Sequence, residues 1–144
     1  MSVVVIKIKT EDELKTCLQI HHDVFIKEQF VSEAEEVDGE DPMAEHFLLY
    51  FKEQAVGTAR VRYINKRAKI ERVAVLNSFR GRGFGKVLMD AILEDLRTSK
   101  KAAWATLGAQ TYAIPFYEKL GFVVYGDEYM DAGIPHKDMK LDLV

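Results

Sequence analysis

The chain has 144 residues, of which 48% are hydrophobic, and a formal net charge of −3. A chain of this length can bury a core without metal or disulfide staples, and its slight acidic excess argues against a general nucleic-acid or membrane-surface binder. Cys17 is the one cysteine, which excludes an internal disulfide, and no hydrophobic run reaches the ~20 residues of a membrane span. The first residues lack a signal-peptide pattern, so we expect one domain, residues 1–144, in the cytoplasm.

The first part of the chain predicts a strand followed by a helix. Residues 3–9 are rich in β-branched side chains that alternate with polar ones, which is typical of a strand. Thr10 and Glu13 have the spacing of a capping box and predict the start of the helix. Its hydrophobic face would carry Leu14, Cys17, Leu18, His21 and Phe25. Residues 33–41 contain six acids and predict a loop.

Three strands are predicted after this loop. Residues 46–51 and 55–64 would form a hairpin through a turn at 52–54, and residues 68–76 would form the third strand. A loop rich in arginine and glycine follows at 77–83. Because adjacent strands place alternate residues on one face, Arg60 and Arg62 are expected to lie beside Lys69 and Glu71. This arrangement fits either a cross-strand charge ladder or a pocket for a substrate carboxylate.

The second half alternates helices and strands. A helix is predicted from residue 84, and its hydrophobic face would carry Phe84, Val87, Leu88, Ala91, Ile92 and Leu96. We expect a strand at 103–107 and a short helix at 113–120 that ends at Gly121. Two strands, at 122–125 and 136–143, complete the order β-α-β-β-β-α-β-α-β-β, which predicts a mixed α/β domain.

The most informative segment is residues 80–86, with the sequence RGRGFGK, at the start of the best-defined helix. It contains three glycines, three cations and no acid. Cations are disfavoured at a helix N-terminus, because the free N–H groups there already carry partial positive charge. The segment therefore predicts an anion site in which backbone N–H groups hold the ligand and the glycines allow close approach. The alternative is a glycine-rich turn with solvated arginines.

The spacing excludes two common phosphate-binding motifs. A Walker loop needs two glycines separated by four residues and then Lys and Ser or Thr, whereas Gly81 and Gly85 are separated by three and Val87 follows the lysine. In the dinucleotide pattern G-x-G-x-x-G, the third glycine would fall on Lys86 or Leu88. The anion would therefore be held by a different kind of loop.

Arg80, Gly83 and Gly85 do match the pattern R/Q-x-x-G-x-G/A. This pattern, the strand before it at 71–75 and the segment PFYEKLGF at 115–122 resemble the cofactor motifs of the GNAT superfamily of N-acetyltransferases. Further blocks resemble the ElaA/YjcF-like branch of that superfamily: VFIKEQ at 24–29, EVD at 36–38, His46, GTAR at 57–60, AQ at 109–110 and GIPH at 133–136. The resemblance covers nearly the whole chain.

The resemblance implies a GNAT fold of the α/β (α+β) class. Its central mixed sheet would have six to seven strands flanked by helices, and two splayed parallel strands would form an acyl-CoA cleft. By the same resemblance, residues 73–75 would face the pantetheine arm and the N–H groups of 82–86 the pyrophosphate. The residues expected to bind acetyl-CoA are Val73, Ala74, Val75, Arg80, Gly81, Arg82, Gly83, Phe84, Gly85, Lys86 and Phe116.

The resemblance also points to catalytic residues. Tyr117 lies where the family places the residue nearest the thioester sulfur, and its phenol would protonate the departing thiolate. Glu71, two residues before Val73, is the first candidate for a general base; the alternative is that it pairs with a neighbouring cation. Glu28 and His136 are the other candidate bases, and the resemblance leaves open that water carries the proton instead. Gly108 departs from the branch, which commonly has Asn there, so a contact to the pantetheine arm or the acceptor is expected to be lost.

The sequence thus predicts an acetyl-CoA-dependent N-acetyltransferase that acts on a primary amine by direct transfer. The alternatives are a non-catalytic acyl-CoA-binding sensor and a protein-interaction module on the same fold. No histidine or cysteine spacing resembles a zinc site, so no metal is expected. Neither a nucleic-acid nor a membrane partner is expected, and a homodimer is compatible with the fold.

Overall fold

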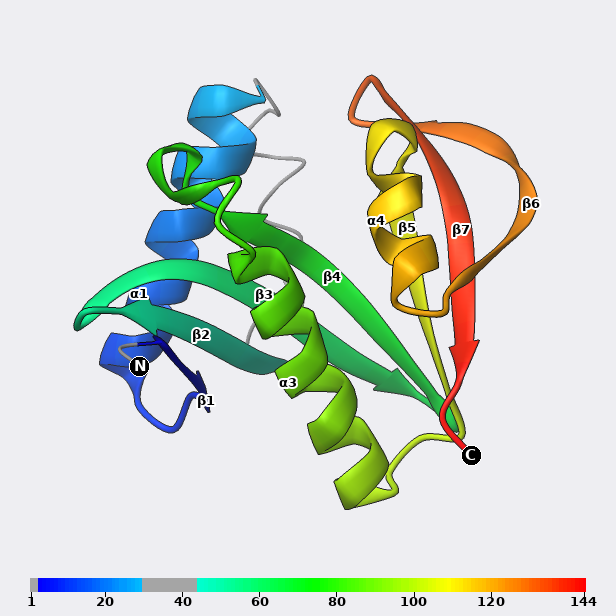
Figure 1. Ribbon diagram of the computed structural model, residues 1–144, viewed down its shortest axis with the longest axis horizontal. Coiled ribbons are helices and arrows are strands. Elements are labelled where there is room, and N and C mark those ends of the chain that lie inside the picture. Colours follow the sequence, from blue (N-terminus) through cyan, green and yellow to red (C-terminus); the bar gives the residue numbers. More distant parts are fainter. Residues whose placement is uncertain (1–2, 30–43) are drawn as a thin grey trace.

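The computed structural model describes residues 3–29 and 44–144, and the following account concerns these residues (Figure 1). Their strands form one mixed sheet in the order β1-β2-β3-β4-β5-β7-β6. The strands are β1 (Val3–Lys7), β2 (Glu45–Phe51), β3 (Gln54–Ile64), β4 (Arg67–Val75), β5 (Trp104–Gln110), β6 (Val123–Asp131) and β7 (Ile134–Asp142). The pair β4 and β5 is parallel, and every other neighbouring pair is antiparallel. The predicted mixed sheet of six to seven strands is confirmed, with seven strands.

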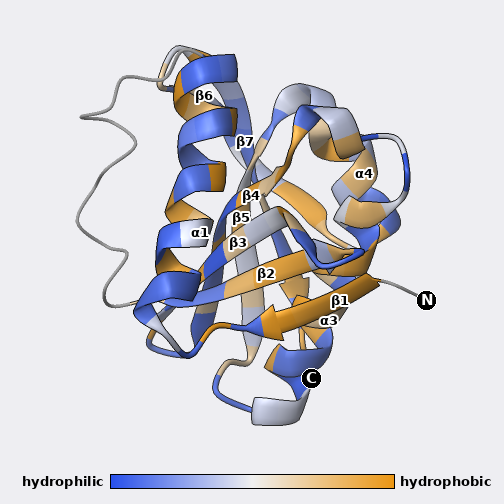
Figure 2. Cartoon of the chain, turned by 90° about the vertical axis from the view of Figure 1, so that its left-hand side faces the viewer, coloured by the Kyte–Doolittle hydropathy of each residue, from blue (hydrophilic) through white to orange (hydrophobic). Residues whose placement is uncertain are grey.

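The helices cover both faces of the sheet. Helix α1 (Glu11–His21) lies on one face, and α3 (Phe84–Ser99) and α4 (Ile114–Lys119) lie on the other (Figures 1 and 2). Helix α1 begins with the predicted capping box, because the Thr10 hydroxyl accepts from the Glu13 N–H at 3.1 Å and the Glu13 carboxylate accepts from the Thr10 N–H at 3.1 Å. It continues into a π-helical segment, His22–Glu28. None of the described helices is long and apolar enough to cross a membrane.

Two hydrophobic clusters hold these layers together. The larger lies between α3 and the sheet and includes Leu88, Ile92 and Leu96 of the predicted hydrophobic face, whereas Val87, which was also predicted there, is exposed. The smaller lies under α1, where Cys17 is fully buried as a reduced core residue. In Figure 2, β1 and much of β2 are orange, the colour of hydrophobic residues.

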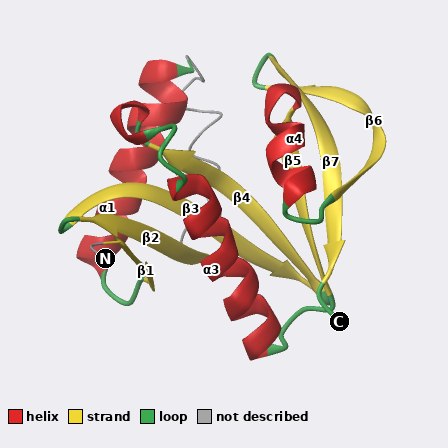
Figure 3. Ribbon diagram, viewed as in Figure 1, coloured by secondary structure: helices red, strands yellow, loops and turns green. Residues whose placement is uncertain are grey.

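The parallel strands β4 and β5 pair over only three residues each. Residues 67–69 of β4 lie beside residues 104–106 of β5, and beyond that point the two strands diverge into a V (Figure 3). A bulge in β4 accompanies the divergence. Arg60 of β3 pairs with Glu71, whereas Thr58 pairs with Ala74, so β4 carries one extra residue. Arg72, in this bulge, has a φ of 54°, in the left-handed region.

The β6–β7 hairpin differs from its prediction. Strand β6 does not end at Tyr125 but continues to Asp131. Its register with β7 shifts between Tyr125 and Tyr129, where Gly126 adopts a φ of 79°. A glycine followed by two acids is a common turn signal, but here it forms an irregularity inside a long strand. The predicted acidic loop at 33–41 lies outside the described residues.

Candidate active site

A cavity of about 460 Å³ opens where β4 and β5 diverge. Its wall on β3 and β4 carries cationic side chains and Glu71, whereas its wall on β5, β6 and β7 carries Gly108, Tyr129 and Asp138. Tyr117, from α4, also lines it. The cavity therefore brings together side chains from both faces of the sheet, because Tyr117 packs on the α3 side and Glu71 on the α1 side.

The glycine loop ends at the N-terminus of α3, beside the open end of the V (Figure 1). Gly81 and Gly83 have φ values of 76° and 82°, which only glycine adopts without strain. Gly83 is the N-cap residue, and no side chain accepts a hydrogen bond from the first turn of the helix. A Cβ atom on Gly83 would meet nothing within 4 Å. Open space therefore lies beside this uncapped end of α3, which fits a bound anion.

The cations of the loop make contacts of their own. Arg80 donates to the carbonyl oxygen of Val75 at 2.9 Å and forms an ion pair with Glu28. Arg82 lies 5.4 Å from the ring centre of Phe79. Arg80 thus joins three parts of the chain: the end of β4, the loop and the π-helical segment after α1.

Helix α4 approaches the start of α3 at Gly85. A Cβ atom there would lie 3.4 Å from the ring of Phe116, so a larger side chain would push the two helices apart. The Phe116 ring packs edge-on against Tyr117, with 5.0 Å between ring centres, and Tyr117 packs against Phe122. These contacts place both aromatic residues of the predicted cofactor motif between the glycine loop and the cavity.

Burial, together with the charge of Tyr112, raises the pKa of Tyr117 above its ordinary value. The phenol therefore stays protonated at neutral pH. No side chain of the described residues accepts a hydrogen bond from its hydroxyl. Tyr117 is therefore a neutral phenol in the cavity wall, with a hydroxyl proton that no described side chain accepts.

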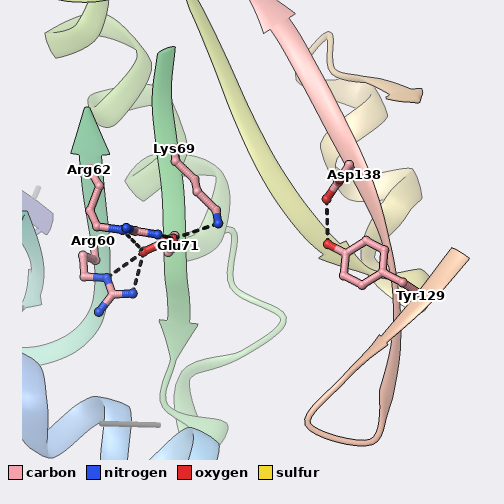
Figure 4. A network of polar contacts seen from close by, with 6 residues as sticks. All are labelled: Arg60, Arg62, Lys69, Glu71, Tyr129 and Asp138. Carbon is pink, nitrogen blue, oxygen red and sulfur yellow. Dashed lines mark hydrogen bonds and ion pairs between the residues drawn. The ribbon is translucent and has the colours of Figure 1, made fainter. Parts of the chain in front are cut away.

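Glu71 lies in a network of ion pairs rather than free in the cavity (Figure 4). Arg60 donates to it from Nε and Nη2 at 2.8 and 2.5 Å, and Arg62 donates from the same atoms at 2.9 and 2.5 Å. Lys69 lies 3.3 Å away. Burial alone would raise the pKa of Glu71, but the hydrogen bonds and charges of the two arginines outweigh it and lower the pKa to about 2. So acidic a carboxyl is a weak base, and the geometry favours the ion-pairing alternative for Glu71.

The two other candidate bases differ in their surroundings. Glu28 forms an ion pair with Arg80. His136 is buried, lines the cavity and has its Nδ1 2.7 Å from the carbonyl oxygen of Ile134. Because a carbonyl oxygen can only accept, Nδ1 must carry the proton, which leaves Nε2 as the nitrogen that can take up another.

Tyr129 takes the space above Gly108. A Cβ atom on Gly108 would lie 2.5 Å from the Tyr129 hydroxyl oxygen. That hydroxyl donates to Asp138 Oδ1 at 2.6 Å (Figure 4). The Tyr129 ring stacks on His136 with 5.8 Å between ring centres. Sequence reasoning identified Gly108 and His136 but missed Tyr129 and Asp138, because their pairing depends on the irregular register of β6. The described residues include no cluster of His, Cys, Asp and Glu that could hold a metal ion.

Comparisons with known proteins agree with this geometry. The model of the family described as "Acetyltransferase (GNAT) domain" matches residues 8–143. The Bacillus subtilis protein named "Uncharacterized N-acetyltransferase YjcF" is 41% identical over 135 residues, which cover 93% of this chain and 96% of YjcF. The crystal structure of Escherichia coli ElaA superposes with a TM-score of 0.86 at 26% identity and covers 96% of this chain and 98% of that one. A GNAT family acetyltransferase from Elizabethkingia anophelis, solved with acetyl-CoA bound, has the same fold, with a TM-score of 0.72 at 16% identity and 98% coverage of both chains.

Proposed function

The chain belongs to the GNAT acetyltransferase family, and we propose that it transfers the acetyl group of acetyl-CoA directly to a primary amine. The observation that carries the proposal is one arrangement in space. An uncapped, glycine-rich N-terminus of α3 lies at the open end of the V, and the cavity in that V holds a protonated tyrosine. The first feature suits a diphosphate, and the second suits a departing thiolate. Residues 1–144 would act as one domain.

The proposed donor site follows the V from its open end inward. The N–H groups of Arg82, Gly83, Phe84, Gly85 and Lys86 would hold the pyrophosphate, next to Gly81. Arg80 would brace the loop through Val75, and the backbone of Val73, Ala74 and Val75 would bind the pantetheine amides where β4 has left β5. Phe116 would pack along the pantetheine arm. Acetyl-CoA supplies the acetyl group as a thioester, whose carbonyl the N–H groups of the β4 bulge would polarise.

The proposed reaction needs one proton donor and one proton acceptor. The amine nitrogen forms a bond to the acetyl carbon, the carbon–sulfur bond breaks, and Tyr117 protonates the sulfur. The amine must lose a proton to attack. Of the predicted bases, His136 fits this role better than Glu71 or Glu28, because the two carboxylates are engaged by arginines and His136 presents Nε2. Glu71 would instead hold the side chains of Arg60 and Arg62 in place in the wall of the site.

Gly83→Val tests the donor site. The side chain would occupy the open space in front of α3, so we expect acetyl-CoA affinity to fall by about 100-fold or more, as a blocked anion site implies. Gly133→Val is the matched control, because Gly133 has a φ of 76°, similar open space and a position in the β6–β7 turn. Calorimetry with acetyl-CoA, CoA and ATP measures binding, and thermal unfolding measures the strain that both variants share. A Gly83→Val protein that binds acetyl-CoA like Gly133→Val would place the cofactor elsewhere.

Turnover is tested with Tyr117→Phe in the same assay series. This variant keeps the ring packing on Phe116 and removes only the hydroxyl. We expect unchanged acetyl-CoA binding and a kcat lowered by about 10²–10³-fold, measured as free thiol release with a panel of primary amines. Wild-type protein that binds acetyl-CoA but acetylates no amine in the panel would favour the non-catalytic sensor.

A further inference from the structure

The cavity has a second polar element that the proposed chemistry does not use. Tyr129 of β6 and Asp138 of β7 form a hydrogen-bonded pair that faces the Glu71 network across the V (Figure 4). The pair occupies the space that a side chain at position 108 would need, since a Cβ atom there would collide with the Tyr129 hydroxyl. Gly108 and Tyr129 are thus complementary: the glycine on β5 makes room for the phenol.

The two walls of the cavity differ in charge. On the wall of β3 and β4, Glu71 is surrounded by Arg60, Arg62 and Lys69. On the opposite wall, Asp138 takes part in none of the ion pairs between described residues. Its side chain accepts a hydrogen bond from the neutral Tyr129 hydroxyl. A partly buried carboxylate without a cation partner attracts a cationic ligand, and four tyrosines line the same cavity: Tyr112, Tyr117, Tyr125 and Tyr129.

The tyrosine fixes the direction of this carboxylate. Burial and the hydrogen bond to Asp138 raise the pKa of Tyr129, so its hydroxyl stays protonated and donates to Oδ1. The stacking of its ring on His136 holds the phenol in place. Oδ2 of Asp138 then remains available to accept from a ligand, close to the imidazole that is the best-placed base.

We propose that the Tyr129–Asp138 pair is the ammonium-binding element of the acceptor site, and that the acceptor enters as a cationic primary amine. This inference rests on the proposed function. Asp138 would bind the ammonium group through a charge-assisted hydrogen bond, and Tyr129 would orient the carboxylate. His136 would take the proton before the nitrogen attacks. Gly108 is the feature that permits this arrangement.

The test measures amine binding separately from turnover. Wild-type protein is saturated with CoA, and 2-phenylethylamine is titrated in while the Gly108 amide signal is followed by NMR; 2-phenylethanol is the uncharged probe. We expect Asp138→Asn to weaken binding of the amine by 10-fold or more and Tyr129→Phe to weaken it by 3-fold or more. Binding of the alcohol should not change in either variant. Gly108→Ala, which displaces the Tyr129 hydroxyl, should resemble Tyr129→Phe.

Matched controls separate this role from general damage. Tyr125→Phe removes a hydroxyl from the same strand and the same cavity, and Asp142→Asn removes a carboxylate from the exposed end of β7. Both should bind 2-phenylethylamine like wild type. Asp138→Asn with unchanged affinity, or wild-type protein that binds the amine no better than the alcohol, would overturn the assignment. Failure to bind CoA in calorimetry would instead count against the proposed function, and the same titration of the free protein would still test the pair.

Discussion

Glu71 illustrates how neighbours decide what a carboxylate can do. On sequence alone it was the first candidate for a general base, because it precedes the expected acetyl site on the same strand. In the structure it accepts four hydrogen bonds from Arg60 and Arg62, and Arg60 is fully buried. A buried guanidinium requires a charged carboxylate partner, so the ionised Glu71 stabilises the fold. A general base would lose this negative charge each time it took up a proton.

Glu71→Gln should therefore destabilise the protein at neutral pH, by about 2–4 kcal/mol, because it leaves the Arg60 guanidinium buried beside a neutral amide. The ordinary pKa of a glutamate is 4.5 and that of Glu71 is about 2, so the carboxylate stabilises the folded state fully above pH 4.5. This contribution is lost as the pH falls from 4.5 through 2.

Urea unfolding of Glu71→Gln and wild type at a series of pH values measures the difference. We expect it to shrink below pH 4.5 and to disappear only below about pH 2. Glu94→Gln, on the exposed side of α3, is the control and should show no such trend. A Glu71→Gln protein of wild-type stability at pH 7 that has lost turnover would restore Glu71 as the base.

Contacts of Arg80 connect the loop between β4 and α3 to two neighbouring parts of the chain. Its glycines adopt left-handed backbone angles, and Arg80 ties it to the end of β4 and to the segment after α1. Both partners in the Arg80–Glu28 ion pair are partly exposed, so the pair is expected to contribute about 1 kcal/mol or less to stability. Its main effect would be on the loop's geometry.

Glu28→Ala should accordingly weaken acetyl-CoA binding by about 3–10-fold, while the free energy of unfolding changes by about 1 kcal/mol or less. Calorimetry and urea unfolding measure the two effects. Lys101→Ala is the control, because it breaks another exposed ion pair, with Glu45 at 2.8 Å, beyond the other end of α3. Tighter binding by Glu28→Ala would mean that Glu28 competes with the cofactor for Arg80.

Most helices and strands were predictable from the sequence. The features that were missed depend on strand register, which is not a local property of the sequence. Helix α3 and the loop before it follow from periodicity and glycine spacing, which are local properties. The Arg60–Glu71 contact was foreseen as one of two possibilities, because strand alternation alone puts both residues on one face. Tyr129 above Gly108 was missed, since it depends on a register shift within β6 that no local pattern records.

At the scale of the whole molecule, the V divides the sheet into two parts. The strands β1 to β4 form one part and β5, β7 and β6 the other, and backbone pairing between them is limited to residues 67–69 with 104–106. The proposed donor site uses both parts, because the β4 backbone and the α3 loop lie on one and Phe116 lies near the other.

A ligand that bridges the two parts should stabilise the molecule as a whole. At an acetyl-CoA concentration of 100 times Kd, the free energy of unfolding should rise by about 2.7 kcal/mol, and Tm by several degrees. Differential scanning calorimetry measures the shift, and hydrogen exchange should slow at β4 amides and at α4 amides together. Protection confined to the α3 loop would show that the ligand contacts one part only.

The divergence of β4 and β5 also gives the sheet two interior edges. Beyond Lys69 and Thr106 the facing N–H and C=O groups of these strands have no ladder partner across the V. An unpaired strand edge on the outside of a protein invites another polypeptide to add to the sheet, with aggregation as the risk. Here the edges face each other within a cavity of about 460 Å³, with helices on both faces of the sheet. In the proposed donor site, the amide groups of the pantetheine arm would use the hydrogen-bonding capacity of this edge, where an exposed edge would recruit a further strand.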